Sequence, residues 1–386
     1  MEVQALRPHV QARYEGYVDS LREMVNIDCG SYTRDGVQRI ADLCASRFQA
    51  MGWDVERRAH EPADGEPALG DLVIGRLVAS EGPRVLLVGH MDTVFDEGTA
   101  AERPFTIDDG VARGPGVSDM KGGLLAGFVA AEALHDADVA RGAAITYVCN
   151  PDEEIGSPFS GPIIRELAPR HDVAFVLEGA RANGDIVSAR KGITDYTITL
   201  DGKAAHAGVE PEKGRNALVA AAHLVIALQA LHGRWPGVTV NVGVAHGGTR
   251  TNVVPARCVL QVDVRSPERA TLEEAEREIE RLCGQPAVDG VRIHPEGHGW
   301  HRPMEKGAEA QRLVDLAVKL AGDLGFELRD AATGGASDAN TTSAAGTPTI
   351  DGLGPVGGDD HAPAEWLDLA SVVPRTTLLA GLIASL

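Results

Sequence analysis

The sequence has no long apolar run, few cysteines, and too few basic residues to balance its acidic ones. No stretch of about 18 or more residues is continuously apolar, so we expect no membrane-spanning helix and no membrane partner. The 36 lysines and arginines face 56 aspartates and glutamates, and the formal net charge of −20 argues against nucleic acid as a partner. The five cysteines are scattered without metal-ligand spacing, and residues 1–22 do not resemble a secretory signal. We therefore expect a cytoplasmic protein with reduced thiols.

What is present is typical of a large α/β protein. Apolar runs at 85–88, 144–149 and 173–177 predict buried strands, and helical patterns lie between them. This alternation predicts a mostly parallel sheet covered by helices. After residue 192 the predicted order becomes βαββαβ, which is that of a ferredoxin-like unit. The expected organisation is a catalytic domain in two parts, with an inserted lid or dimerisation domain between them: 1–192, 193–300 and 301–386.

Three local expectations follow from turn residues and periodicity. Residues 97–116 are rich in charged and turn residues and predict an irregular loop. Residues 326–329 predict a strand after a helix at 308–324. A final helix is expected from about Ser371, with Pro374 tolerated in its first turn.

Ionisable residues follow directly after several of the predicted buried strands. They are His90, Asp92, Asp119, Glu153, Glu154, Glu178 and His361. In a parallel α/β sheet the ligand crevice lies outside the carboxyl ends of the strands. Each residue alone could be an ordinary surface residue, or a histidine with its hydrogen bonds made within the fold. Several carboxylates in one crevice repel one another, however, and their burial costs free energy unless a cation lies among them. Carboxylates with two imidazoles and no thiolate suit catalytic zinc, with cobalt or manganese as alternatives.

The charges of this set favour two ions. Asp119, Glu154 and Glu178 supply three negative charges, and a bridging hydroxide would supply a fourth against two Zn²⁺. Two metals about 3.5–4 Å apart activate a water and polarise a carbonyl. Glu153 adjoins Glu154, so one of the pair could bind metal while the other acts as general base. The glycines around Asp119 leave a phosphate loop as an alternative, although the run lacks the usual phosphate-loop spacings.

Five motifs occur in a recognisable order. They are Gly-His-Met-Asp-Thr-Val (89–94), Gly-Val-Ser-Asp-Met-Lys-Gly-Gly (116–123), Asp-Glu-Glu-Ile-Gly (152–156), Glu178 and Asp-Asp-His-Ala (359–362). The chain resembles the dinuclear zinc peptidase family of glutamate carboxypeptidase (carboxypeptidase G), aminoacylase, acetylornithine deacetylase and succinyl-diaminopimelate desuccinylase. The resemblance covers nearly the whole chain, including the inserted domain. It is closest to the glutamate carboxypeptidase branch.

The resemblance implies how the metals are held. His90 and Glu178 bind one zinc, and Glu154 and His361 bind the other. Asp119 bridges the two ions.

The resemblance also implies the catalytic groups. Asp92 orients His90, and Glu153 takes a proton from the bridging water and passes it to the leaving nitrogen. A cis peptide bond is implied between Asp119 and Met120.

The inserted domain carries His206, within Gly-Lys-Ala-Ala-His-Ala-Gly. A lone histidine in a turn is usually only surface. In dimeric relatives the matching histidine enters the partner subunit's active site and stabilises the oxyanion. The resemblance therefore implies this role for His206 and a homodimer through the inserted domain.

Other residues match positions that contact substrate in relatives. Asn252 lies in a segment, 249–255, that resembles a substrate-contacting part of the lid. Arg302 falls where relatives keep an arginine that grips the substrate α-carboxylate, although it would otherwise read as an ordinary surface residue.

The sequence departs from the glutamate-specific relatives at one position. Those relatives have a lysine where this chain has Ile186, and Arg190 or Lys191 is the alternative cation in this part of the sequence. Because Ile186 replaces this lysine, strict glutamate specificity is not expected.

A Gly-rich loop with Gly335 and Ser337 matches a loop near the substrate in relatives, where backbone N–H groups can hold a carboxylate.

The resulting hypothesis is a two-zinc hydrolase of a small amide with a free carboxylate, such as an N-acyl amino acid or a dipeptide-like molecule. One alternative is an aminoacylase or N-acyl deacylase that prefers an apolar group, which Ile186 favours. The other is a non-catalytic metal-binding protein on the same fold. The presence of both Glu153 and Asp92 argues against the second alternative.

Overall fold

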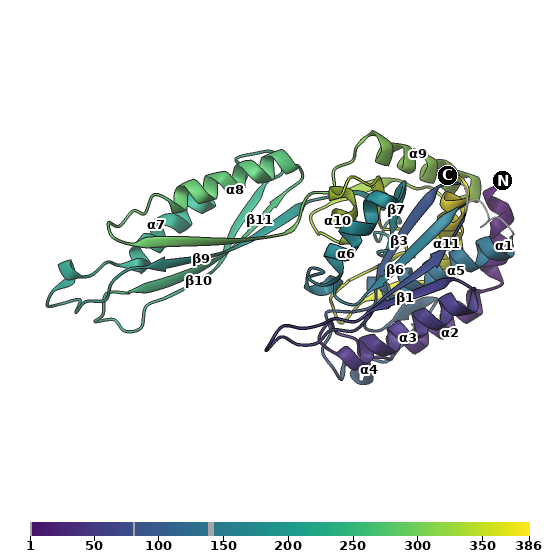
Figure 1. Ribbon diagram of the computed structural model, residues 1–386, viewed down its shortest axis with the longest axis horizontal. Coiled ribbons are helices and arrows are strands. Elements are labelled where there is room, and N and C mark those ends of the chain that lie inside the picture. Colours follow the sequence, from purple (N-terminus) through teal and green to yellow (C-terminus); the bar gives the residue numbers. More distant parts are fainter. Residues whose placement is uncertain (1, 80–81, 138–142) are drawn as a thin grey trace. The chain divides into compact units, whose positions relative to one another are not determined.

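A computed structural model describes residues 2–79, 82–137 and 143–386 (Figure 1). The chain divides into two compact units. The first comprises Met1–Ala189, Lys306–Ala332 and Ser337–Leu386, and the second comprises Arg190–Glu305 and Thr333–Ala336. Within the described ranges, no helix is both long and apolar enough to cross a membrane.

The first unit is built on a six-stranded sheet in the order β1-β2-β6-β3-β7-β14. Its strands, in that order, are Asp54–Arg58, Leu72–Leu77, Ala144–Asn150, Arg84–His90, Val173–Val176 and Thr349–Ile350. β3 pairs in parallel with β6 and β7, and β14 pairs in parallel with β7. β1 and β2 form an antiparallel edge. The sheet is mostly parallel, which confirms the expected α/β class.

Helices cover both faces of this sheet, because its central strands are apolar on both sides. Val85 and Leu87 of β3 belong to the main core with residues of α3, α5 and α11. The alternating residues Leu86 and Val88 are also buried but point to the opposite face. Figure 1 shows α6 and α10 together, apart from α5 and α11. These helices are Arg34–Ala50 (α3), Gly123–Asp136 (α5), Ser160–Leu167 (α6), Asp338–Ala344 (α10) and Leu369–Ala384 (α11).

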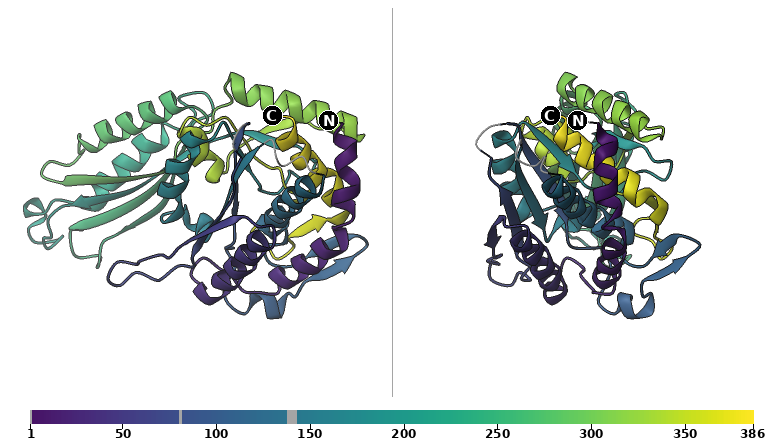
Figure 2. Two further views of the ribbon diagram at one scale, coloured as in Figure 1. Left: turned by 45° about the vertical axis from the view of Figure 1, so that its right-hand side comes forward. Right: turned by 90° about the vertical axis from the view of Figure 1, so that its right-hand side faces the viewer.

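The two ends of the chain lie close together in the first unit (Figure 2). The short helix η1 contacts both α9 and α11, which explains this proximity. The remaining helices of the unit are Val3–Leu6 (η1), Arg7–Gln11 (α1), Tyr14–Val25 (α2), Thr99–Glu102 (α4), Val117–Gly122 (η2), Glu153–Ile155 (η4), Ala168–Arg170 (η5) and Ala308–Leu324 (α9).

Three local expectations were wrong. Residues 97–116 are not an irregular loop, since they contain α4 and the antiparallel strands β4 (Thr106–Asp108) and β5 (Val111–Arg113). These strands join β15 (Gly357–Gly358) and β16 (Trp366–Asp368) in a small sheet. Such pairing depends on partners more than two hundred residues away, and local periodicity does not encode it.

Residues 326–329 form no strand and instead lead from the end of α9 at Leu324 to the next strand. Gly325 adopts a φ of 89°, and the N–H of Phe326 returns to the carbonyl of Ala321 at 3.0 Å. This is the hydrogen bonding of a glycine-terminated helix, with an apolar residue packed behind it. The strand begins later, as β13 (Asp330–Thr333), and pairs with β8 (Ile186–Arg190).

The final helix begins earlier than expected. It starts at Leu369, where Asp368 caps it by accepting from the N–H of Ala370 at 2.9 Å. Pro374 therefore lies beyond the first turn, inside the helix.

The second unit has the order βαββαβ, with the sheet order β10-β11-β9-β12 and antiparallel pairing throughout. Its elements are β9 (Gly192–Asp201), η6 (Pro211–Lys213), α7 (Ala217–Gln229), β10 (Thr239–Gly247), β11 (Arg257–Ser266), α8 (Arg269–Cys283) and β12 (Arg292–His301). Tyr196, Ile198 and Leu200 point from β9 into a core shared with α7 and α8. The alternating pattern of β9 thus produces a sheet with helices on one face.

Candidate metal centre

Three adjacent strands deliver candidate ligands at their carboxyl ends. β3 ends at His90, β6 leads into the turn Glu153–Ile155, and β7 ends just before Glu178. β3 lies between β6 and β7 and runs parallel to both, so the three ends meet at one edge of the sheet. The η2 segment adds Asp119, and the segment between β15 and β16 adds His361.

Asp119 lies between the two imidazoles. Its Oδ1 is 3.0 Å from Nε2 of His90, and its Oδ2 is 3.0 Å from Nε2 of His361. The peptide bond between Asp119 and Met120 is cis, as the resemblance implies. His361 has a φ of 63°, a left-handed conformation that is uncommon for a residue other than glycine. One carboxylate thus contacts both histidines of the predicted ligand set.

Two glutamates complete the cluster. Nε2 of His361 is 3.1 Å from Oε2 of Glu154, and Nε2 of His90 is 3.7 Å from Oε1 of Glu178. In the part of the chain that the structure describes, His90, Asp119 and Glu154 offer ligand atoms that all lie within 4.8 Å of one another. The structure therefore brings all five predicted ligands together.

Asp92 lies beneath this cluster and is fully buried. Its main-chain oxygen is 3.0 Å from Nδ1 of His90, and its Oδ1 is 3.5 Å away. The carboxylate also accepts from the N–H groups of Glu153 and Glu154, at 3.1 and 3.2 Å, and from the Ser31 hydroxyl at 2.6 Å. Asp92 thus connects the His90 strand to the turn that carries the two glutamates.

The pKa values show how much charge is crowded here. Burial, together with the charge of Asp119, raises the pKa of Glu178 to about 8 and that of Glu154 to about 7. The pKa of His361 is raised to about 10 by its bonds to Asp119 and Glu154. Burial alone would raise the pKa of Asp119, but the bonds from His361 and His90 lower it. Without a metal ion, the negative charge of this site is therefore reduced by protons that remain bound to its side chains. A bound cation would displace these protons.

The residues fit a divalent metal. Oε1 of Glu154 is buried and has no hydrogen-bond partner among the described residues, and such an oxygen normally has one. Two imidazole nitrogens and three carboxylates form a donor set that suits zinc.

Glu153, beside Glu154 in the turn, has a strongly raised pKa. Its pKa is raised well above the usual value, first by burial, with Glu178 and Glu154 adding to the rise and His90 opposing it. A carboxylate with a raised pKa suits a proton acceptor near neutral pH.

Comparisons with known proteins agree with this geometry. The profile of peptidase family M20/M25/M40 matches residues 86–385. Carboxypeptidase G2 from Pseudomonas sp. (strain RS-16) is 31% identical over 379 residues, which cover 96% of this chain and 89% of that protein. The chain belongs to the M20/M25/M40 peptidase family. It is a metal-dependent peptidase or amidohydrolase, and the predicted resemblance is confirmed.

Solved structures of other proteins share the fold of this family member. Aminopeptidase PepT from Bacillus cereus ATCC 10987 has a TM-score of 0.78 at 24% identity, covering 96% of this chain and 98% of its own. A tripeptidase from Staphylococcus aureus has a TM-score of 0.80 at 21% identity, with the same coverage. A metallo-carboxypeptidase from Sulfolobus solfataricus, Sso-CP2, has a TM-score of 0.73 at 16% identity and covers 96% of this chain and 99% of its own. These identities establish the fold and leave the substrate open.

Two residues predicted to contact the substrate lie side by side in the second unit. The N–H of Ala207 donates to the carbonyl of Asn252 at 3.0 Å, and His206 forms a β-bridge with Val253. The His206 side chain is exposed, and its Nδ1 accepts from the N–H of Gly208 at 3.2 Å. The fold therefore brings together two residues far apart in the sequence.

The predicted Gly-rich loop has two kinds of contact. Nη1 of Arg190 donates to the carbonyl of Gly335 at 3.2 Å, so these two residues meet. The Ser337 hydroxyl caps α10 by accepting from the N–H of Ala339, and it donates to Asp351 at 2.7 Å. Ser337 is 2% exposed, so its hydroxyl is already used within the fold.

Arg302 also has a partner within its own unit. Its Nη1 is 3.0 and 3.1 Å from the two carboxylate oxygens of Glu276. Glu276 accepts a further hydrogen bond from the Thr194 hydroxyl at 2.7 Å. The guanidinium predicted to grip a substrate carboxylate thus already contacts an internal one.

Sequence reasoning missed one buried support of the centre. Glu365 is 1% exposed and accepts from the N–H groups of Gly116, Ser118 and Asp119 at 2.9, 2.8 and 3.0 Å. In the sequence, only its position four residues after His361 suggests a role at the site. The residues around Glu365 do not indicate that its side chain is buried.

A second missed support holds the Glu153–Ile155 turn from below. Asp338 accepts from Nδ2 of Asn150 and from the Ser157 hydroxyl, both at 2.7 Å. Asp152 accepts from the N–H of Phe159 at 2.7 Å. These bonds fix the chain on both sides of the turn.

Proposed function

We propose that this protein hydrolyses an amide bond in a small N-acyl amino acid or dipeptide-like substrate with a free carboxylate. Two zinc ions would be held by His90, Asp119, Glu154, Glu178 and His361, with cobalt or manganese as possible replacements. The observation that carries the proposal is the position of the Asp119 carboxylate, 3.0 Å from each imidazole. A carboxylate placed in this way suits a bridge between two ions.

Each remaining residue has a task in this proposal. Zinc lowers the pKa of a bound water and polarises a carbonyl oxygen. Glu153 takes the proton of the attacking water and gives it to the leaving nitrogen. Asp92 holds the His90 ring and the backbone of the glutamate turn in place. His206 donates to the carbonyl oxygen as negative charge develops there.

The second unit is proposed to act as a lid and dimerisation domain, so that His206 would serve the partner subunit's site. Leu218, Val219 and Ile226 of α7 are 44%, 45% and 71% exposed, and β10 is an edge strand beside this helix. Exposed apolar residues next to an unpaired edge favour association. The five free and buried cysteines suit the reducing cytoplasm.

Substrate choice is the least determined part of the proposal. Ile186 is uncharged and lies buried in the main core, so this position offers no cation to a glutamate side chain. This favours, as a second candidate, an N-acyl amino acid deacylase that prefers an apolar side chain. Arg190, Asn252, Arg302, Gly335 and Ser337 remain proposed substrate contacts.

The test is a panel of amides with the zinc-loaded protein. The panel contains N-acyl-glutamate, N-acyl-methionine, dipeptides and an amide without a carboxylate. We expect zinc-dependent hydrolysis of carboxylate-bearing amides only. A preference for methionine over glutamate would select the deacylase, and no hydrolysis by fully loaded protein would overturn the proposal.

A further inference from the structure

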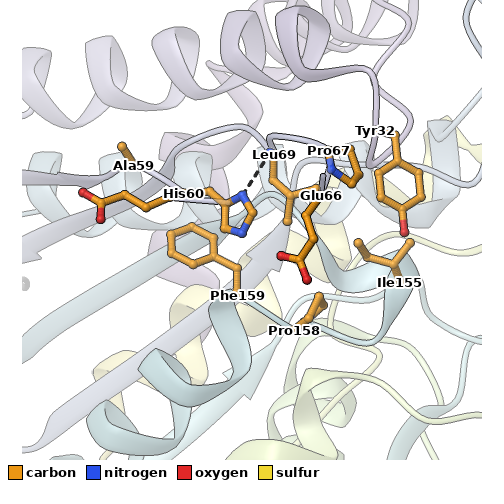
Figure 3. A pocket seen from close by; sticks show the side chains of 10 residues that line it. Tyr32, Ala59, His60, Glu66, Pro67, Leu69, Ile155, Pro158 and Phe159 are labelled. Carbon is orange, nitrogen blue, oxygen red and sulfur yellow. Dashed lines mark hydrogen bonds between the residues drawn. The ribbon is translucent and has the colours of Figure 1, made fainter. Parts of the chain in front are cut away.

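A cavity of about 630 Å³ lies in the first unit beside the turn that carries Glu153 and Glu154 (Figure 3). Ile155, the last residue of that turn, lines the cavity. Tyr32 also lines it, and the neighbouring Ser31 donates to Asp92 beneath the metal centre. Two of the lining residues, Ile155 and Tyr32, are therefore sequence neighbours of residues at the site of the proposed reaction.

The cavity has aromatic walls. The His60 and Phe159 rings lie 5.1 Å apart with an interplanar angle of 57°. Nδ1 of His60 accepts from the N–H of Leu69 at 3.2 Å, so Nε2 carries the ring proton. Figure 3 shows the Glu66 side chain between this ring pair and Tyr32. Flat groups can stack on such walls.

The charges of the lining all have one sign. Glu61 and Glu66 line the cavity, and the described lining contains no lysine or arginine. A carboxylate placed here would be repelled, whereas an ammonium group or a hydrogen-bond donor would be attracted. The proposed substrate has a carboxylate half and an acyl half. The charge of the lining therefore favours the acyl half over the carboxylate half.

We infer that the cavity binds the acyl half of the substrate and selects aromatic acyl groups that carry a positive charge or hydrogen-bond donors. This inference rests on the proposed amide hydrolysis and specifies its substrate class. The volume agrees, since a cavity of about 150 Å³ already binds benzene and ligand pockets span about 300–1,000 Å³. An acetyl group would leave most of the space unused.

The first experiment varies the charge of the acyl group at constant shape. Three amides of one amino acid are compared, with 4-(aminomethyl)benzoyl, 4-methylbenzoyl and 4-carboxybenzoyl groups, and the N-acetyl amide serves as reference. We expect kcat/KM to fall in that order, by roughly tenfold for each step in charge. Hydrolysis of all four at equal kcat/KM would refute the cavity inference and leave amide hydrolysis intact. Hydrolysis of none would instead refute the proposed function.

Variants then assign the preference to the cavity. Glu61→Gln with Glu66→Gln should bring the cationic and anionic substrates to within about twofold of each other, while the 4-methylbenzoyl substrate changes little. The matched control is Glu97→Gln with Glu102→Gln, which makes the same change in net charge at exposed positions outside the cavity. If the control had the same effect, general electrostatics rather than the cavity would be responsible.

A binding measurement is independent of turnover. All five native cysteines are buried, so Tyr32→Cys introduces an accessible thiol at the cavity wall. In a Glu153→Gln background, the 4-(aminomethyl)benzoyl amide should slow labelling of this thiol at concentrations at which the 4-carboxybenzoyl amide does not. Equal protection by both amides would contradict selection by charge. No protection by either would contradict occupation of the cavity.

Discussion

The Glu365 carboxylate accepts a hydrogen bond from the backbone N–H of Asp119 at 3.0 Å. The same carboxylate accepts from the N–H groups of Gly116 and Ser118, so a residue close to His361 in the sequence holds the segment of Asp119 in place. Burial raises the pKa of Glu365 to about 7, while these backbone bonds oppose the rise. These hydrogen bonds join the two segments that carry Asp119 and His361.

Glu365→Gln should weaken this support without removing a ligand. An amide turns one acceptor into a donor that faces backbone N–H groups, so we expect the free energy of unfolding to fall by about 1–3 kcal/mol. Supporting groups around metal ligands typically change affinity about 10–100-fold, and zinc affinity should fall accordingly. Urea unfolding and zinc titration measure the two effects. The control is Glu97→Gln, which makes the same change at an exposed position. Reduced stability with unchanged zinc affinity would show that Glu365 supports only the fold.

Asp119→Asn should remove both ions, because Asp119 contacts the histidines of both halves of the site. His361→Ala should remove only one, since His90 and Glu178 remain in place. The measurement is the metal content after dialysis. We expect two ions per chain for the wild type, one for His361→Ala and fewer than one for Asp119→Asn. Two ions retained by Asp119→Asn would show that this carboxylate does not bridge them.

Glu153→Gln should keep its metal and lose most of its turnover. The residue is proposed to move the proton, and general acid–base catalysis contributes about 10²–10⁴-fold. The matched variant is Glu154→Gln, which changes the next residue and should lose metal because Glu154 contacts His361 at 3.1 Å. We would measure kcat and metal content of both. A Glu153→Gln enzyme with wild-type kcat would exclude the base assignment.

Much of the centre was predictable because each part has a local signal. The run from Val85 to Val88 predicts a buried strand, and His90 directly follows it. The same logic applies to Glu153 after β6 and to Glu178 after β7. Parallel strands bring their ends together whatever their separation in sequence, so the class of fold is enough to predict that these side chains converge.

The rest could not be predicted because it depends on contacts between distant segments. Glu365 and Gly116 are far apart in sequence, and neither lies in a periodic pattern. The partner of Arg302 is Glu276 of α8, and in the sequence Glu276 looks like any other charged residue on the exposed face of a helix. The Ser337 hydroxyl caps α10 and donates to Asp351, and the Gly-rich sequence around it gives no sign of either contact. Such assignments need the coordinates of both partners.

His171 predicts a pH dependence outside the metal centre. Its ring lies between the Leu167 carbonyl and the Thr146 hydroxyl, both at 2.9 Å, and burial lowers its pKa. The unfolded chain then binds the proton more readily, so stability is lost as pH falls through the unfolded pKa of about 6.5. Urea unfolding at pH 5 and 7.5 should show a smaller loss for His171→Asn than for the wild type. The exposed His135→Asn is the control, and an equal loss in all three proteins would contradict the assignment.

Arg302→Ala should raise KM for carboxylate substrates with little change in kcat, because the proposed contact binds the ground state and the transition state equally. Glu276→Gln should do the opposite and lower KM, since it removes the internal carboxylate that now contacts Arg302 at 3.0 Å. Hydrolysis of an amide without a carboxylate by the wild type, at the rate of its carboxylate-bearing counterpart, would contradict the contact. Urea unfolding of both variants shows whether the pair matters only for stability. If both lost stability while KM stayed constant, Arg302 would be a structural partner of Glu276 and not a substrate contact.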